Sequence, residues 1–285
     1  MDHPLQLHVD GLTDIGNRRD NNEDAWWAGR PGGAHCMMEP GKSPLQLMPS
    51  EGFVLLQVSD GVGGANAGEV ASHMSVSLVA QALERSPAGF AEAAAVRPAL
   101  VAAMREAHRA ILVKAEEPGH DGMAATLSAV GVARDGQACW AQAGDSRIYH
   151  WRAGRLRQVS RDHSPVGRLK QQGRITEAEA REHPARNRID LSLGDRLNPF
   201  EPDSGIVALR PGDVLLLCSD GLSDGLWDHE IAQALTLLQR PADLRPVVRG
   251  LVANAKRASG RDNITVVAAL AVAVERRWWW RRLWS

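Results

Sequence analysis

The tripeptide Ser-Asp-Gly occurs twice in this chain, each time directly after a run of apolar residues. Residues 53–58 lead into Asp60, and residues 214–218 lead into Asp220. Four to six aliphatic and β-branched residues bounded by turn residues predict a buried strand. Each aspartate therefore lies at the edge of a core, where a carboxylate without a partner is costly. Two such carboxylates in similar contexts indicate a shared cation, because hard divalent cations prefer oxygen ligands.

The composition sets wide bounds on the fold and on the partners. With 285 residues and 44% hydrophobic residues, the chain can form one large domain or two small ones. Its formal net charge of -1 gives no general attraction to nucleic acid or to a membrane. We expect Cys36, Cys139 and Cys218 to be buried or free thiols in a reducing compartment, because they are odd in number and lack metal-binding spacing. Residues 1–11 contain no signal-peptide apolar segment, so we expect a soluble cytoplasmic protein.

The apolar pattern predicts strands and paired helices, with no linker and no solenoid repeat. Because these elements are grouped and do not strictly alternate, we expect an α+β fold with mainly antiparallel sheets. Residues 29–52 are rich in Gly and Pro and predict a long surface loop, and residues 176–179 form a capping box. The expected helices cover residues 64–85, 98–117 (with Pro98 near its start), 228–238 (with Asp228 as its cap) and 244–258, and the expected strands cover 126–133, 138–143, 146–151, 156–160, 206–209, 213–218 and 264–274.

Three further acidic clusters lie next to expected strands. They are residues 19–24, 144–147 and 260–263. Taken singly, Asp-Asn and Asp-Ser sequences are common in turns, and a structural role is the simpler interpretation of each. Five acidic sites beside strands are difficult to explain by turns alone, which favours a metal site.

These clusters form an ordered series that resembles the PPM family, or type 2C, of metal-dependent Ser/Thr protein phosphatases, in its bacterial form. The resemblance extends from Arg19 to Val267. It implies a β-sandwich of two antiparallel sheets flanked by helix pairs, in four layers, and a single domain over residues 1–275. The matching motifs are Arg19-x-x-x-Glu23-Asp24, Asp60-Gly61-x-Gly63-Gly64, Gly122-Met123-Ala124-Ala125-Thr126, Gly144-Asp145-Ser146-Arg147, Ser219-Asp220-Gly221 and Asp262-Asn263.

The resemblance also implies a role for each residue of these motifs. In this family two Mn²⁺ or Mg²⁺ ions activate a water that attacks the phosphate. Arg19 would bind the substrate phosphate through its planar guanidinium, and Asp60 would bridge the two metals. The other implied assignments are Glu23 and the Gly61 carbonyl as ligands of one metal, Asp220 and Asp262 as ligands of the other, Asp145 with Asp220 at a third, weaker metal site, Asp24 orienting metal-bound water, and Asn263 supporting the neighbouring loop.

Two regions depart from the eukaryotic pattern or vary within the family. Val62 stands where some eukaryotic members have a histidine that serves as candidate general acid. His163 and His183 are candidate substitutes, although a histidine beside a turn is more often structural. Residues 167–193 match the flap of bacterial members, which would read the substrate sequence or gate the third metal. A solvated lid without selectivity is the alternative.

The chain ends in a segment unlike the rest, residues 276–285, which is rich in Trp and Arg. Such mixtures bind membrane interfaces or partner grooves, and the alternative is a frayed terminus. The Trp26-Trp27 pair is instead expected in the core.

The leading functional hypothesis is a phosphatase, acting as a monomer, that removes phosphate from Ser/Thr of phosphorylated proteins and reverses a bacterial Ser/Thr kinase. The alternatives are a pseudophosphatase that binds a partner without turnover and an esterase for small phosphate esters. No binding to nucleic acid is expected.

Overall fold

The computed structural model describes residues 4–32, 44–62, 67–85, 90–196 and 199–274. Cys36, Gly63, Gly64 and the segment 276–285 lie outside these residues. Within them, no helix is long and apolar enough to cross a membrane.

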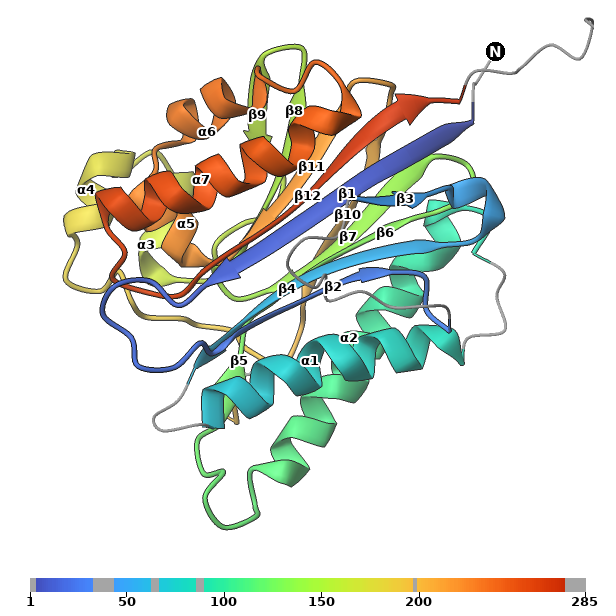
Figure 1. The fold of residues 1–285 in the computed structure, drawn as a ribbon. Coiled ribbons are helices and arrows are strands. Elements are labelled where there is room, and N and C mark those ends of the chain that lie inside the picture. Colours follow the sequence, from blue (N-terminus) through green and yellow to red (C-terminus); the bar gives the residue numbers. More distant parts are fainter. Residues whose placement is uncertain (1–3, 33–43, 63–66, 86–89, 197–198, 275–285) are drawn as a thin grey trace, which may run out of the picture.

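Two antiparallel sheets pack face to face (Figure 1). The first has the strand order β3-β1-β12-β11-β8-β9, and the second has the order β10-β7-β6-β4-β2, with β5 paired to β4. The strands of the first sheet are β1 (Leu5–Asp14), β3 (Leu45–Leu47), β8 (Arg147–Arg152), β9 (Arg155–Gln158), β11 (Val214–Cys218) and β12 (Ile264–Ala273). The strands of the second are β2 (Asp24–Gly29), β4 (Val54–Val62), β5 (Ala124–Ala125), β6 (Leu127–Val132), β7 (Gln137–Ala143) and β10 (Asp203–Ala208).

Helices cover the outer face of each sheet, which confirms the expected α+β sandwich of four layers (Figure 1). The second sheet is covered by α1 (Ala67–Glu84) and α2 (Ala93–Lys114). The first is covered by α5 (Asp220–Gly225), α6 (Asp228–Leu235) and α7 (Leu244–Ala258). The remaining helices are α3 (Pro165–Gln171), α4 (Glu177–Glu182) and the short 3-10 helices η1 (Pro49–Glu51) and η2 (Pro241–Asp243).

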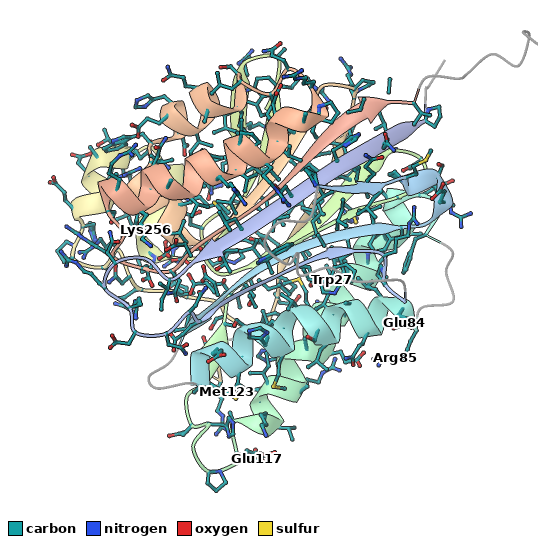
Figure 2. All side chains as sticks on the ribbon, viewed as in Figure 1. Trp27, Glu84, Arg85, Glu117, Met123 and Lys256 are labelled. Carbon is teal, nitrogen blue, oxygen red and sulfur yellow. The ribbon has the colours of Figure 1, made fainter. Side chains whose placement is uncertain are left out.

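Alternating side chains of the strands build the core on both faces of each sheet. Along β11, Val214 and Leu216 pack under the helices, whereas Leu215 and Leu217 pack against the second sheet. This follows from the two-residue period of a strand, and both faces are buried because each sheet has a layer on either side. The adjacent Trp26 and Trp27 also divide in this way, and Trp27 lies on the side of β2 that α1 covers (Figure 2). The prediction that this pair belongs to the core is confirmed.

Three local predictions differ from the structure. Helix α2 begins at Ala93, so Pro98 lies inside it; buried Ala93 and Val96 continue the apolar face toward the N-terminus. Asp228 is the first residue of α6, and its Oδ1 accepts a hydrogen bond from the Tyr149 hydroxyl at 2.8 Å. The expected loop over residues 29–52 contains strand β3, which completes an edge of the first sheet.

Two other local predictions are confirmed. The Thr176 hydroxyl accepts a hydrogen bond from the Glu179 backbone N–H, and the Glu179 carboxylate accepts one from the Thr176 backbone N–H. Cys139 and Cys218 are buried free thiols. Burial raises the pKa of each thiol to about 12, so neither is a thiolate nucleophile at neutral pH.

Antiparallel pairing brings distant acidic residues to one end of the sandwich. Asp24 at the start of β2 is paired in register with Asp60 at the end of β4. In the other sheet, Cys218 at the end of β11 is paired with Val266 near the start of β12. Asp220 follows that strand end, and Asp262 precedes that strand start. We call this end of the sandwich the acidic edge.

Candidate metal centre

Asp60 and Gly61 are held by backbone hydrogen bonds at the end of β4. Asp60 donates its N–H to the Thr126 Oγ1 and accepts the Thr126 N–H at its carbonyl, each at 2.9 Å. Gly61 donates its N–H to the Glu23 carbonyl at 3.1 Å. A Cβ at position 61 would lie 2.3 Å from the Gly68 carbonyl oxygen. Only glycine permits this approach, so the backbone at position 61 is packed between the segment before β2 and the start of α1.

Asn263 fixes the segment that carries Glu23. Its Oδ1 accepts the Glu23 N–H at 2.8 Å, and its Nδ2 donates to the carbonyls of Ile15 and Asn21, each at 3.0 Å. Asn263 is buried, so these bonds are shielded from water. Burial is the largest cause of the raised pKa of the Glu23 carboxyl, and the nearby Arg19 opposes it.

Asp24 joins the two sheets at the acidic edge. Its Oδ2 accepts a hydrogen bond from the Ser219 hydroxyl at 2.7 Å, and the Ser219 hydroxyl in turn accepts the Thr265 N–H at 2.9 Å. Its Oδ1 is buried and has no hydrogen-bond partner. Burial raises the pKa of Asp24 to about 6, although the hydrogen bonds of Thr265 and Ser219 act in the opposite direction.

Asp220 follows β11 and Asp262 precedes β12 at the same end of this strand pair, and the two residues differ in their partners. Asp220 is the first residue of α5, and its Oδ1 is buried without a hydrogen-bond partner. Asp262 has two partners: its Oδ2 lies 2.7 Å from the Arg19 Nη2, and its Oδ1 accepts the Asn263 N–H at 2.9 Å. The first of these carboxylates therefore lacks a partner, and the second already has a cationic one.

The carboxylates at this edge repel one another strongly. The pKa of Asp60 is raised well above its usual range by burial and then by the negative charges of Asp24, Asp220, Asp145 and Asp262. The pKa of Asp220 is raised similarly, first by burial and next by Asp145. Such mutual effects arise between carboxylates that lie near one another, in agreement with the strand pairing that sets Asp24 opposite Asp60. The structure therefore brings together the five aspartates that the sequence assigned to the site.

Two observations test whether these residues fit a divalent cation. Within the described residues, no three His, Cys, Asp or Glu side chains form a closed metal-ligating group. The donor atoms themselves are all oxygens, and two of them, Asp24 Oδ1 and Asp220 Oδ1, are buried and unsatisfied. Buried carboxylate oxygens without a partner are costly, and a cation would satisfy them. The donor set fits Mg²⁺ or Mn²⁺ and does not fit zinc, which favours nitrogen and sulfur.

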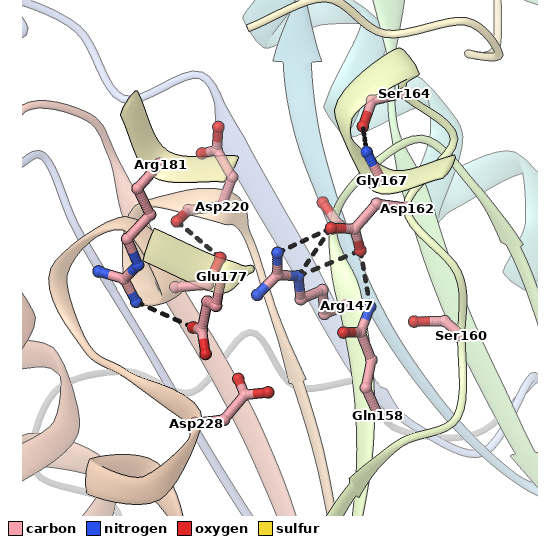
Figure 3. A network of polar contacts seen from close by, with 12 residues as sticks. Arg147, Gln158, Ser160, Asp162, Ser164, Gly167, Glu177, Arg181, Asp220 and Asp228 are labelled. Atoms are coloured by element: carbon pink, nitrogen blue, oxygen red, sulfur yellow. Dashed lines mark hydrogen bonds and ion pairs between the residues drawn. The ribbon is translucent and has the colours of Figure 1, made fainter. Parts of the chain in front are cut away.

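A cavity lies beside Asp145 and Asp220 and is also lined by residues of α3 and α4. Figure 3 shows the polar contacts of Arg147, Asp162 and Arg181 on its wall. On its wall Arg147 donates three hydrogen bonds to Asp162, the shortest at 2.7 Å. Arg181 of α4 donates to the Leu226 carbonyl at 2.6 Å, and its guanidinium lies 3.7 Å from the centre of the Trp227 ring. The segment 167–193 is therefore attached to the turn after α5, beside the acidic edge.

The two candidate histidines make local contacts. His163 Nδ1 accepts the Gly144 N–H at 3.1 Å, and its Nε2 lies 3.3 Å from the Asp203 Oδ2. His183 Nδ1 accepts the Ala185 N–H at 3.1 Å. Both arrangements fit the structural interpretation of these histidines.

Sequence reasoning gave no role to two residues that organise the site. Thr126 holds both backbone groups of Asp60, and Ser219 links Asp24 to β12. Both stand inside the quoted motifs, and Ser219 directly precedes Asp220, so their place in these motifs was the available signal. Their hydrogen bonds join residues 66 and 195 positions apart, which a local pattern does not reveal.

Two antiparallel sheets lie between helix pairs, and strands of both sheets end at the acidic edge, whose donor atoms are all oxygens. This fold and this site together are those of a metal-dependent phosphatase. Comparison with known proteins agrees. The sequence profile of protein phosphatase 2C matches residues 46–266. A putative protein phosphatase 2C-type of Streptococcus pyogenes is 32% identical over 89% of this chain and 93% of its own length. The chain belongs to the protein phosphatase 2C family, and it is a metal-dependent protein-serine/threonine phosphatase.

Two further comparisons concern the phosphatase PstP. The serine/threonine protein phosphatase PstP of Mycobacterium tuberculosis is 35% identical over 93% of this chain, which spans 45% of that longer protein. The structure of the PstP catalytic domain in complex with two manganese ions has a TM-score of 0.73 and 33% identity, covering 94% of this chain and 99% of that one.

Proposed function

We propose that Asp60 bridges two divalent cations at the acidic edge. Glu23 and the Gly61 carbonyl complete the ligands of one cation, and Asp220 and Asp262 hold the other. The observation that carries this assignment is the convergence of negative charge on Asp60: Asp24 is its partner in the strand register, and the charges of Asp220, Asp145 and Asp262 also act on it. The unsatisfied Oδ1 of Asp220 supports it further.

We propose that the cations are Mn²⁺ or Mg²⁺, as the manganese in the PstP structure suggests. Two such ions, when bound, acidify a water and neutralise phosphoryl oxygens. The residues of this chain do the positioning. Asp24, held by Ser219, orients a water at the centre, and Asn263 keeps the Glu23 segment in place. Arg19, at the rim of the acidic edge, binds the phosphate of the substrate through two N–H groups.

Asp145 is assigned to a third, weaker cation shared with Asp220. Burial, followed by the charge of Asp162, raises the pKa of Asp145 to about 7. The cavity lined by residues of α3 and α4 joins these two carboxylates and leaves room beside the main centre.

The proposed substrates are phosphoserine and phosphothreonine in proteins phosphorylated by a bacterial Ser/Thr kinase, whose action this enzyme reverses in the cytoplasm. We propose that residues 1–275 form one phosphatase domain, active as a monomer. Residues 276–285 form a separate tail that contacts a membrane surface or a partner. Nothing in the formal charge of -1 favours nucleic acid.

The test is a comparison of two substrates with and without metal. EDTA should abolish hydrolysis of a phosphoserine peptide, and Mn²⁺ or Mg²⁺ should restore it. A pseudophosphatase would bind the peptide without hydrolysis in either condition. An esterase for small molecules would hydrolyse p-nitrophenyl phosphate and leave the peptide intact. Full activity of metal-free protein in chelator would refute the proposed centre.

A further inference from the structure

A groove of about 390 Å³ lies beyond the end of β4, next to the acidic edge. Val62, the last residue of β4, lines this groove and is 37% exposed. Asn187 of the segment 167–193 lines both the groove and the cavity beside Asp145 and Asp220. The groove and that cavity therefore meet at Asn187, at the edge of the proposed metal centre. We call it the Val62 groove.

The strand register places Val62 on the same face of β4 as Asp60. The pairing of β4 with β6 continues in the same register into its pairing with β5, so β4 has no bulge before Val62. Residues two apart on a regular strand share a face, and they are about 7 Å apart. The Val62 groove therefore lies about one such step beyond the carboxylate that we assign to both cations.

Small residues surround Val62 in the groove. Strand β5 lies beside the end of β4 (Figure 1), and its Ala125 exchanges two backbone hydrogen bonds with Leu193 on the other side, at 2.8 and 3.0 Å. Val62 is directly opposite Ala124, and Gly194 follows Leu193. Val62, Ala124 and Gly194 all line the groove. Because the last two carry at most a methyl group, they leave space beside Val62 for a side chain of another molecule.

The Val62 groove offers apolar contact and no dominant charge. Ile189 lines it as well and adds a third aliphatic side chain to those of Val62 and Ala124. Its charged residues are of both signs, namely Asp121, Asp195 and Arg196. Removal of apolar surface from water favours an aliphatic side chain here, whereas a carboxylate or an ammonium group would lose hydration without a matching charge.

The substrate itself supplies a side chain at this place. A phosphorylated Ser or Thr whose phosphate reaches the cations at Asp60 belongs to a polypeptide that continues from that residue. An extended chain advances about 3.3–3.6 Å per residue, so about 7 Å corresponds to two residues. A side chain within two positions of the phosphorylated residue therefore reaches the Val62 groove while the phosphate is bound.

We propose that the Val62 groove binds an aliphatic side chain of the substrate, located within two residues of the phosphorylated Ser or Thr. The phosphatase is thereby selective for sequences with such a residue, and Val62 and Ile189 determine this selectivity. The inference rests on the proposed position of the phosphate at Asp60, and it adds a sequence preference to that function.

A set of phosphoserine peptides tests the proposal on the full chain with Mn²⁺. The peptides are identical except for Leu, Glu or Lys at one of the two positions on either side of the phosphoserine. At one or more of these four positions, kcat/KM for the Leu peptide should exceed that for the Glu and Lys peptides about tenfold or more, as expected of an apolar pocket.

Ile189→Lys should shift this preference toward the Glu peptide, so that the ratio of kcat/KM for Leu over Glu falls about tenfold. A general loss of folding or catalysis lowers both values and cancels in the ratio. The matched control is Leu237→Lys, the same change at a residue that is 66% exposed beyond α6, and its ratio should stay within about twofold of the wild type. If Ile189→Lys does not fold, Ile189→Ala should lower the ratio in the same direction by a smaller factor.

Equal kcat/KM for the Leu, Glu and Lys peptides at all four positions would overturn the groove proposal and leave the phosphatase function standing. An unchanged ratio in Ile189→Lys, or an equal change in Leu237→Lys, would overturn it as well. Hydrolysis of none of the peptides would instead refute the proposed substrate class. Non-hydrolysable phosphonate versions of the peptides, followed by fluorescence anisotropy, then test the groove alone: tighter binding of the Leu version supports it, and equal binding overturns it.

Discussion

The guanidinium of Arg19 and the carboxylate of Asp262 form an ion pair, with Nη2 2.7 Å from Oδ2. The residue we assign to the substrate phosphate thus contacts a residue we assign to a metal. Their side chains are 49% and 28% exposed, and pairs this accessible contribute only about 0–1 kcal/mol. Breaking this ion pair so that Arg19 binds phosphate or Asp262 binds a metal therefore costs little free energy. Until substrate arrives, Asp262 holds Arg19 near the centre.

Arg19→Ala should mainly raise KM for a phosphoserine peptide, if Arg19 binds the phosphate equally in the ground state and the transition state. Affinity for Mn²⁺ should not fall, because the substitution frees Asp262. Steady-state kinetics and calorimetric titration of Mn²⁺ measure the two effects. A fall in kcat alone would show that Arg19 acts chiefly in the transition state, and unaltered kinetics would remove it from the site.

Asp60→Asn should lower kcat by more than about 100-fold, since it removes the charge of the proposed bridging ligand. The same change relieves repulsion with Asp24 and Asp220, so the chelated variant should melt at a higher temperature than the chelated wild type. Melting with and without Mn²⁺ checks both points, because the variant should lose most of the stabilisation that the metal gives. A variant that is less stable in chelator and retains its response to Mn²⁺ would contradict the assignment.

Asp145→Ala should leave two metals bound and still reduce activity. If a third cation assists protonation of the leaving group, the loss should be larger on a phosphoserine peptide than on p-nitrophenyl phosphate, whose phenolate leaves without much proton transfer. The alternative is that Asp145 only stabilises the turn between β7 and β8. Equal losses on both substrates, together with a lower melting temperature, would favour that alternative.

Arg147→Ala should destabilise the domain by about 3–5 kcal/mol, the usual cost of removing one member of a buried ion pair. Its side chain is 14% exposed and that of Asp162 is 10% exposed, so the remaining carboxylate would have little access to water. Urea denaturation measures the loss. Arg85→Ala is the control, because its pair with Glu106 is exposed and should contribute less than about 1 kcal/mol.

Asp213→Asn tests the pH dependence of stability where Asp213 contacts Arg152 and His150. Burial alone would raise the pKa of Asp213, but the hydrogen bonds of Arg152 and His150 outweigh it and hold the pKa at about 2. A carboxyl whose pKa is lowered in the folded state stabilises the fold at pH values above its pKa in the unfolded chain, about 3.9. This stabilisation is lost as the pH falls toward 2. The wild type should therefore exceed the variant by about 2 kcal/mol at pH 7, with the difference shrinking below pH 4. A difference independent of pH would mean that packing, and not charge, causes it.

Much of the fold was predictable because its signals are local. Helix α7 has the predicted bounds, and the capping box of Thr176 forms as expected, since both depend on residues three or four positions apart. Strand β1 was not predicted, although it joins β12 over ten paired residues. Its sequence, LQLHVDGLTD, mixes polar and apolar residues, and its partner at the other end of the chain supplies the order.

By itself, the sequence determined which residues end the strands and carry acidic groups. An apolar run followed by Ser-Asp-Gly predicts a buried strand with a carboxylate at its end. It also predicts a glycine where two backbone segments pack closely. The tertiary structure alone decided which groups face each other: Asp24 accepts a hydrogen bond from Ser219 of the other sheet, and Arg19 pairs with Asp262. Electrostatic and hydrogen-bond energies depend on distance in space, and strand pairing sets those distances between residues that are far apart in the chain.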